Sequence, residues 1–281
     1  MQLKPFDWVS PYYRDDSLLL SIGMTPYELM LQLLAKYDDP FSAGKTYYSH
    51  PSLKDDDKPK IIHQSSATGM QAIPTTGIAM GIKFKEKTSL EKPKKNFEPV
   101  VVCSMGDASI TEGEVAEAFQ MASLKQLPIL FLVQDNEWDI SAYSDETRVC
   151  NAHEYSKGFG IESYSIDGTN FIKCFNTVEK ILKKIRKDRK PVLLHAKVPL
   201  LNHHTSGVRM EWYRDDIDES KKRDPFPKLR KELVKINVND AYLNEIFEKH
   251  KKIINEQYTK AVAAGDPKPE CIFDNIFAEN K

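Results

Sequence analysis

Two short and almost wholly apolar runs, PVVVCSM at 99–105 and LPILFLVQ at 127–134, most limit how this chain can fold. Runs of this length, rich in Val, Leu and Ile, are typical of strands that are buried on both faces of a parallel sheet. Between them, residues 111–125 carry apolar and small side chains at intervals of three and four. This spacing predicts the helix that must connect two parallel strands.

The same alternation continues along the chain, with a short helix that starts at 153 and ends at Gly158, a strand at 161–167, a helix at 171–188 and a strand at 190–200. Alternating strands and helices predict an α/β fold with a mostly parallel sheet flanked by helices. A further helix is expected at 26–37, after the Thr-Pro start signal. Residues 1–24, 38–62 and 202–223 are expected to be irregular. We predict a single domain over 1–281, in which 226–281 form a helical C-terminal extension.

Composition excludes several classes of protein. The 281 residues are 41% hydrophobic, which suits a globular core, and 40 basic against 41 acidic residues give no excess of positive charge for binding nucleic acid. No apolar run is long enough to cross a membrane, and the first residues do not resemble a signal peptide. The four cysteines form no CxxC pair. A reducing, cytoplasmic setting is therefore expected.

Two polar residues follow the two apolar runs directly: Asp107 comes after the first and Asn136 after the second. Ligands of open parallel sheets bind beyond the carboxyl ends of the strands. If the strands are neighbours, Asp107, Asn136 and a nearby backbone carbonyl supply oxygen ligands suited to Mg²⁺, and the helix after Ser109 offers N–H groups to a phosphate. The alternative is that Asp107 is an ordinary turn residue.

The motif GDA, followed about thirty positions later by DN, resembles the thiamine-diphosphate motif. Other segments, including PYYRDD, HQSSATGMQ, TEGEVAEAF, NHHT and RDPFPKLR, follow in the order seen in the α subunits of 2-oxo acid dehydrogenases. The chain is therefore similar over nearly its full length to the first components of the branched-chain (2-oxoisovalerate) and pyruvate enzymes. The resemblance implies a thiamine-diphosphate-binding fold and the cofactors thiamine diphosphate and Mg²⁺.

The resemblance also implies roles for individual residues. Asp107, Asn136 and the main-chain carbonyl of Trp138 would hold Mg²⁺ against the diphosphate of the cofactor. The remaining implied contacts are those of Tyr13 and Arg14 with the diphosphate, of Ser66 and Thr68 with the aminopyrimidine, and of the Ala108 and Ser109 amides with the phosphates. For Arg14 the alternative is a surface ion pair with a neighbouring aspartate.

The histidine pair in NHHT is the other implied active-site feature. His204 would lie at the mouth of the site, beside phosphate and substrate, where an imidazole exchanges protons near neutral pH. His203 would orient or pack the loop. A loop pair without function is the alternative that the residues alone leave open.

The chain departs from the family pattern in four places. Ala108 replaces a glycine, which is tolerated only where φ is not positive. Gln134 stands where relatives carry an arginine that reaches toward the phosphate. The loop TSGVRMEWYRDD lacks the paired aspartate that relatives carry soon after the histidine pair. Relatives also have several helices before YYRD, so the chain either is shortened or has that part replaced by another chain.

The implied activity is oxidative decarboxylation of a 2-oxo acid, with transfer of the acyl group to a lipoyl group on a second enzyme. The partners would be a β subunit or β half, in an α2β2-like heterotetramer, and a lipoyl-bearing acyltransferase. The small-residue helix GIAMGIK is one candidate contact surface, and a buried core helix is the equally good alternative. An acetoin dehydrogenase-type α subunit and a non-catalytic structural subunit are the alternatives. A Rossmann domain is disfavoured, because no GxGxxG follows a predicted strand.

Overall fold

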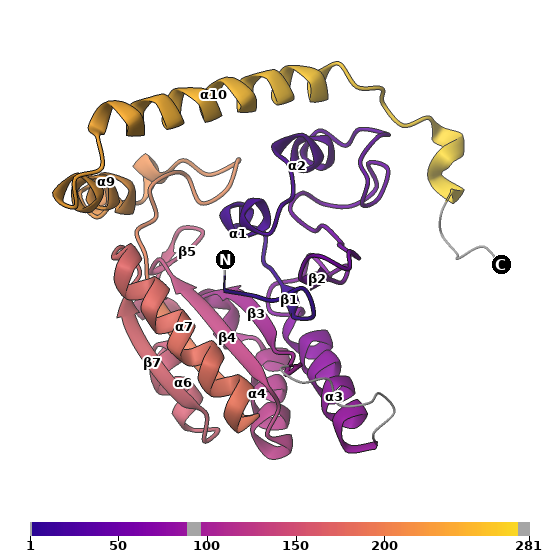
Figure 1. Ribbon diagram of the computed structural model, residues 1–281, viewed down its shortest axis with the longest axis vertical. Helices are drawn as coiled ribbons and strands as arrows, with labels where there is room; N and C mark the ends of the chain where they lie inside the picture. Colours follow the sequence, from indigo (N-terminus) through magenta and orange to yellow (C-terminus); the bar gives the residue numbers. More distant parts are fainter. Residues whose placement is uncertain (1, 89–96, 275–281) are drawn as a thin grey trace.

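The computed structural model describes residues 2–88 and 97–274 of the chain (Figure 1). Its centre is a six-stranded sheet in the order β2-β1-β3-β4-β8-β7, in which every neighbouring pair is parallel. The strands are β1 (Trp8–Ser10), β2 (Lys60–Ile61), β3 (Val101–Gly106), β4 (Ile129–Asp135), β7 (Glu162–Asp167) and β8 (Val192–Lys197). A separate antiparallel pair is formed by β5 (Trp138–Asp139) and β6 (Ala142–Tyr143). The predicted α/β class is confirmed.

Helices lie on both faces of the sheet, as Figure 1 shows. The α-helices are α1 (Asp16–Ser21), α2 (Pro26–Leu33), α3 (Ala72–Thr88), α4 (Gly113–Lys125), α5 (Ser144–Thr147), α6 (Ala152–Lys157), α7 (Phe171–Asp188), α8 (Ile217–Lys222), α9 (Pro225–Lys235) and α10 (Asp240–Val262). Short 3-10 helices are η1 (Ala108–Thr111), η2 (Met210–Trp212) and η3 (Pro269–Phe273).

The alternation of side chains along the central strands divides the core into two layers. Odd-numbered positions of β3 and β4, such as Cys103 and Phe131, pack against α3, α4 and α6, while even-numbered positions such as Val102 and Leu130 lie in the α7 layer. Successive side chains of a strand point to opposite faces, so a strand buried on both faces must be apolar throughout. This is why the two apolar runs predicted β3 and β4 correctly.

Local signals set the ends of the predicted helices. Thr25 accepts a hydrogen bond from the backbone N–H of Glu28, whose carboxylate accepts one from the Thr25 N–H, and this capping box starts α2. Helix α7 starts where the Asn170 side chain accepts from the Lys173 N–H, and it ends at Arg189, whose φ is 51°. The predicted span of 171–188 is therefore confirmed.

Residues 1–24 are not irregular, as the sequence suggested, because they contain β1 and α1. The short segment Trp8–Ser10 lies between β2 and β3 in the sheet, and Val9 is fully buried there. The expected loop at 38–62 likewise contains β2. Both strands are too short to show a periodic pattern. The pairing of β2 with β1, and of β1 with β3, comes only from the tertiary structure.

The expected polar loop at 202–223 contains η2 and α8, which corrects that prediction. The predicted helical C-terminal part is present as α9, α10 and η3 up to residue 274, and the rest of it lies outside the described residues. In Figure 1, α10 runs along one side of the molecule above α2. Gln257 accepts a hydrogen bond from the Tyr27 backbone N–H at 2.8 Å, and Lys260 lies over the Tyr27 ring.

Candidate functional site

The predicted site residues gather at the carboxyl edge of the sheet. The chain leaves β1 toward β2 on one side, whereas it leaves β3 toward β4 on the other. The strand order therefore reverses between β1 and β3, and such a switch point opens a crevice for a ligand. The loops after β1 and β3 carry Arg14 and Asp107, respectively.

Asp107 and Asn136 lie side by side, as predicted from the two strand ends. Strands β3 and β4 are hydrogen-bonded neighbours, and the Asn136 N–H donates to Asp107 Oδ1 at 3.3 Å. Both side chains are buried. Asp107 Oδ2 is also buried. It lies 2.7 Å from the Arg148 guanidinium, but it accepts no well-directed hydrogen bond from any residue within 2–88 and 97–274. A buried carboxylate without a full set of hydrogen-bond donors is suited to a bound cation.

Trp138 lies next to this pair. Its backbone N–H donates to Asn136 Oδ1 at 3.0 Å, and its ring packs against Tyr143 and Tyr213. Within the described parts of the chain, no group of three or more His, Cys, Asp or Glu side chains is placed to hold a metal ion. Any Mg²⁺ here therefore depends on amide and carbonyl oxygens in addition to the Asp107 carboxylate.

Ala108 and Ser109 form the first part of η1, directly before α4. Asp107 has φ −66°, and Ala108 is not among the described residues with positive φ. The condition under which an alanine is tolerated at this position is therefore met. Ser109 is buried, so its main chain lies close to the strand ends.

Arg14 is held by its aromatic neighbours rather than by an ion pair. Its Nη1 donates to the Tyr12 hydroxyl at 3.2 Å, and its Nη2 donates to the Tyr13 hydroxyl at 3.3 Å. The same Nη2 lies 3.5 Å from the His204 carbonyl oxygen, which links two loops 190 residues apart. Asp15 accepts from the Tyr12 backbone N–H, and Asp16 accepts from the Tyr48 and Ser49 hydroxyls. Among the described residues, Arg14 forms no ion pair with Asp15 or Asp16, which was the alternative.

Ser66 and Thr68 lie on an exposed loop between β2 and α3. Together with Tyr13 and Ser109 they line a cavity of about 20 Å³. A cavity of this size holds about one water molecule. The loop does bring the four predicted residues to one place.

Gln134 takes part in the internal structure of the site. Its amide nitrogen donates to Asp15 Oδ1 at 2.6 Å and to Ser104 Oγ at 3.1 Å. An amide nitrogen carries two hydrogens, so this arrangement leaves none to donate to a phosphate. Gln134 thus fixes the loop after β1 to β3 and β4.

The two histidines have different surroundings. His203 Nδ1 accepts a hydrogen bond from the Met210 backbone N–H at 3.2 Å, which ties the loop together. Burial lowers the pKa of His204 to about 4, helped by the charges of Arg14 and Arg214. Its Nδ1 is buried and has no hydrogen-bond partner in the described parts of the chain. His204 is therefore neutral at pH 7 and has a nitrogen free for another group.

The lowered pKa of His204 predicts a pH-dependent loss of stability. In the unfolded chain, His204 takes up a proton near pH 6.5, whereas in the folded chain it does so only near pH 4. The contribution of neutral His204 to the free energy of unfolding is therefore complete above pH 6.5, and it decreases as the pH falls toward 4. We expect His204→Gln to have a shallower decrease than the wild type, measured by urea unfolding at pH 7, 5.5 and 4.5. An equal loss of stability with falling pH in His204→Gln and the wild type would contradict the assignment of this pH dependence to His204.

The sequence did not reveal a network of buried charged and polar side chains that begins at Asp107. Arg148 Nη2 lies 2.7 Å from Asp107 Oδ2 and 3.0 Å from Asp135 Oδ1. Asp135 Oδ2 lies 2.7 Å from His195 Nε2, and His195 Nδ1 lies 2.9 Å from Ser165 Oγ. His195 was the available signal, because a single histidine within the apolar strand VLLHAK needs a buried partner.

The pKa values of Asp107 and Asp135 are shifted in opposite directions. Burial raises the pKa of Asp107, and the charge of Asp135 adds to this effect, while Arg148 opposes it. Burial acts in the same direction on Asp135, but the hydrogen bond to His195 and the charge of Arg148 bring its pKa below the usual value. Asp135 thus carries its negative charge more readily than Asp107.

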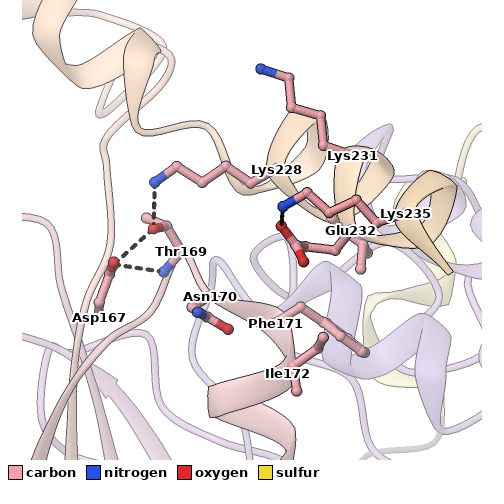
Figure 2. A pocket seen from close by; sticks show the side chains of 10 residues that line it. Asp167, Thr169, Asn170, Phe171, Ile172, Lys228, Lys231, Glu232 and Lys235 are labelled. Atoms are coloured by element: carbon pink, nitrogen blue, oxygen red, sulfur yellow. Dashed lines mark hydrogen bonds and ion pairs between the residues drawn. The ribbon is translucent and has the colours of Figure 1, made fainter.

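A larger cavity, of about 280 Å³, lies elsewhere, between α9 and the turn from β7 to α7 (Figure 2). Figure 2 shows Lys228 donating to Thr169 Oγ1, at 2.7 Å, and Lys235 paired with Glu232. No residue predicted from the sequence lines this cavity. We assign it no part in the site.

The fold and the site together define an α/β protein with polar side chains at the carboxyl edge of a parallel sheet, next to the point where the strand order reverses. The chain belongs to the dehydrogenase E1 component family, whose model matches residues 1–270. This family comprises the oxidoreductase components of 2-oxo acid dehydrogenase complexes and implies thiamine diphosphate as cofactor. Within it, the chain is of the α-subunit type.

Three relatives illustrate this similarity. The 2-oxoisovalerate dehydrogenase subunit alpha of Bacillus subtilis (strain 168) is 27% identical over 284 residues, covering 98% of this chain and 81% of that protein. The pyruvate dehydrogenase E1 component subunit alpha of Rickettsia bellii (strain RML369-C) is 22% identical, covering 94% and 78%. A chloroplastic pyruvate dehydrogenase E1 component subunit alpha-3 of Arabidopsis thaliana is 27% identical, and the match covers 98% of this chain and 63% of that protein.

The relatives come from bacteria and from a chloroplast, so they do not support the predicted cytoplasmic location in particular. None of the helices within the described residues has both the length and the apolar content needed to span a membrane.

Proposed function

We propose that this chain binds the diphosphate of thiamine diphosphate through Mg²⁺ and acts with a β-type chain in the oxidative decarboxylation of a 2-oxo acid. The observation that carries the proposal is the contact between Asp107 and Asn136 at the switch point of the sheet. An acid and an amide there offer the oxygen ligands that Mg²⁺ prefers, and the metal retains further positions for water and phosphate.

The residues present fit this cofactor in three respects. The buried Asp107 Oδ2 contacts Arg148 but accepts no well-directed hydrogen bond in the described parts of the chain, which is compatible with a cation nearby. Asn136 and the main-chain carbonyl of Trp138 would complete the protein's ligands. Arg14, together with Tyr13, would contact the diphosphate, because a guanidinium presents several donors to phosphate oxygens.

Other residues would act around the proposed metal and diphosphate contacts. The amides of Ala108 and Ser109 precede α4 and would donate to phosphate. Ser66 and Thr68 would line the pyrimidine side. His204 would face the substrate as a neutral base or hydrogen-bond donor, since its Nδ1 is without a partner among the described residues.

Thiamine diphosphate, when bound, supplies the carbon nucleophile and the electron sink for loss of CO₂ from a 2-oxo acid. This chain would bind and orient the diphosphate end of the cofactor and exclude water from it. The β subunit or β half would supply the remaining part of the site, and a lipoyl-bearing acyltransferase would accept the acyl group. Helix α3 offers one surface for the β-type chain: Gly77 and Gly81 face open space there, beside the exposed Met80 and Phe84.

The experiment that tests this function is an assay of the chain assembled with its β-type partner. We expect lipoamide reduction and CO₂ release with branched-chain 2-oxo acids or pyruvate, dependent on thiamine diphosphate and Mg²⁺. Activity with acetoin alone would identify an acetoin dehydrogenase-type subunit. Cofactor binding without turnover of any of these substrates would support a non-catalytic structural subunit instead.

A further inference from the structure

We infer that Arg148 and Asp135 are a matched pair of positioning residues that hold the Asp107 carboxylate in place for the metal. The inference rests on the proposed Mg²⁺ site. Three observations support it: the scarcity of other contacts to Asp107, the complete hydrogen bonding of Asp135, and the balance of charge among the three side chains.

Asp107 has few other contacts that fix its carboxylate. Its Oδ1 accepts only a long hydrogen bond of 3.3 Å from the Asn136 backbone, within the described residues. Its Oδ2 is 2.7 Å from Arg148 Nη2. The Arg148 side chain is only 6% exposed, so this contact is not screened by solvent. The orientation of the Asp107 carboxylate therefore depends on Arg148.

Asp135, in contrast, is fully engaged by donors and is not free to bind a metal. Its Oδ1 accepts from the Glu137 backbone N–H at 2.9 Å and from Arg148 at 3.0 Å. Its Oδ2 is hydrogen-bonded to His195, which is fully buried in β8. Asp135 thus holds Arg148 in a fixed position. Mutation of groups that orient a metal ligand in this way commonly lowers metal affinity by 10–100-fold.

The balance of charge explains why Arg148 and Asp135 belong together. One guanidinium between two buried carboxylates leaves a net charge of −1 to attract a cation. Removing Arg148 alone leaves two buried carboxylates opposite each other without a counter-ion, and this arrangement is strongly unfavourable. Removing both the guanidinium and the Asp135 charge returns the site to −1, with Asp107 as its only carboxylate.

A double-mutant cycle tests this pairing. The measurement is the apparent affinity for MgCl₂ by calorimetry on the assembled enzyme, at a fixed saturating concentration of thiamine diphosphate. We expect Arg148→Met to weaken Mg²⁺ binding about 10–100-fold. We expect Asp135→Asn combined with Arg148→Met to bind within about threefold of the wild type, since the site then again carries a net charge of −1.

Arg186→Met is a matched control for general destabilisation. Arg186 pairs with the fully buried Asp7 through two contacts, of 2.9 and 2.5 Å, far along the sheet from Asp107. Its loss also leaves a buried carboxylate unpaired. We expect this variant to have a lower melting temperature and an unchanged affinity for Mg²⁺.

Two results would overturn the inference: wild-type Mg²⁺ affinity in folded Arg148→Met, or a double variant more than tenfold weaker than the wild type. If Arg148→Met does not fold, the double variant decides by the same threshold. Asp107→Ala separates the two levels of the argument. If it loses Mg²⁺-dependent binding while Arg148→Met does not, only the pairing is wrong, whereas its retention of binding would refute the metal site itself.

Discussion

Replacing Asp107 by alanine is expected to weaken Mg²⁺-dependent binding of thiamine diphosphate by more than about a hundredfold. The change removes the only carboxylate that the proposed metal site offers directly to the ion. Its effect should therefore exceed the 10–100-fold that is typical of residues acting behind a ligand. A hundredfold loss corresponds to about 2.8 kcal/mol of binding free energy. Calorimetric titration of the assembled enzyme measures it.

Two variants sharpen this test. Asp107→Asn keeps an oxygen at the same place but removes its charge, so an intermediate loss is expected. Asp167→Ala is the matched control, because Asp167 also ends a strand of the same sheet, where it accepts from the Thr169 backbone and hydroxyl. That variant should keep wild-type affinity. Equal affinities in Asp107→Ala and the wild type would end the assignment of Asp107 to the metal.

Replacing Phe119 by alanine is expected to reduce the free energy of unfolding by about 3–5 kcal/mol. Phe119 is fully buried on α4, and its ring centroid lies 4.7 Å from that of Phe131 and 5.7 Å from that of Phe159. The change removes apolar contacts and leaves a cavity between α4 and the sheet. Equilibrium urea unfolding of the purified protein gives the difference.

The matched control for this prediction is Leu124→Ala on the same helix. The Leu124 side chain is 66% exposed, so its removal should change stability by no more than about 0.5 kcal/mol. A loss for Phe119→Ala that is as small as this would mean that α4 is not packed against β4 as the structure shows.

The central part of the fold was predictable because its signals are local. The apolar runs of β3 and β4, the capping box of α2 and the periodicity of α7 each lie within one stretch of sequence. Asp107 and Asn136 were found for the same reason, since each directly follows a recognisable strand. That the two strands are neighbours was an assumption, which the sheet order confirms.

Other parts of the fold could not be predicted locally. Strand β1 has only three residues, and it forms because β2 and β3 supply partners for its backbone on either side. Residues 202–223 appeared to be a polar loop. They contain α8 and the buried Arg214, which donates to the Leu200 carbonyl at 2.7 Å. Such contacts depend on chain segments that meet only after folding.

The sequence by itself thus determined the α/β class, the family resemblance and the position of Asp107 and Asn136 at two strand ends. The tertiary structure alone decided what stands behind that pair. Arg148 reaches Asp107 and Asp135 from a loop, and His195 reaches Asp135 from β8, 60 residues away in sequence. Ionic contacts in a buried site depend on distance in space, and sequence spacing carries no record of that distance.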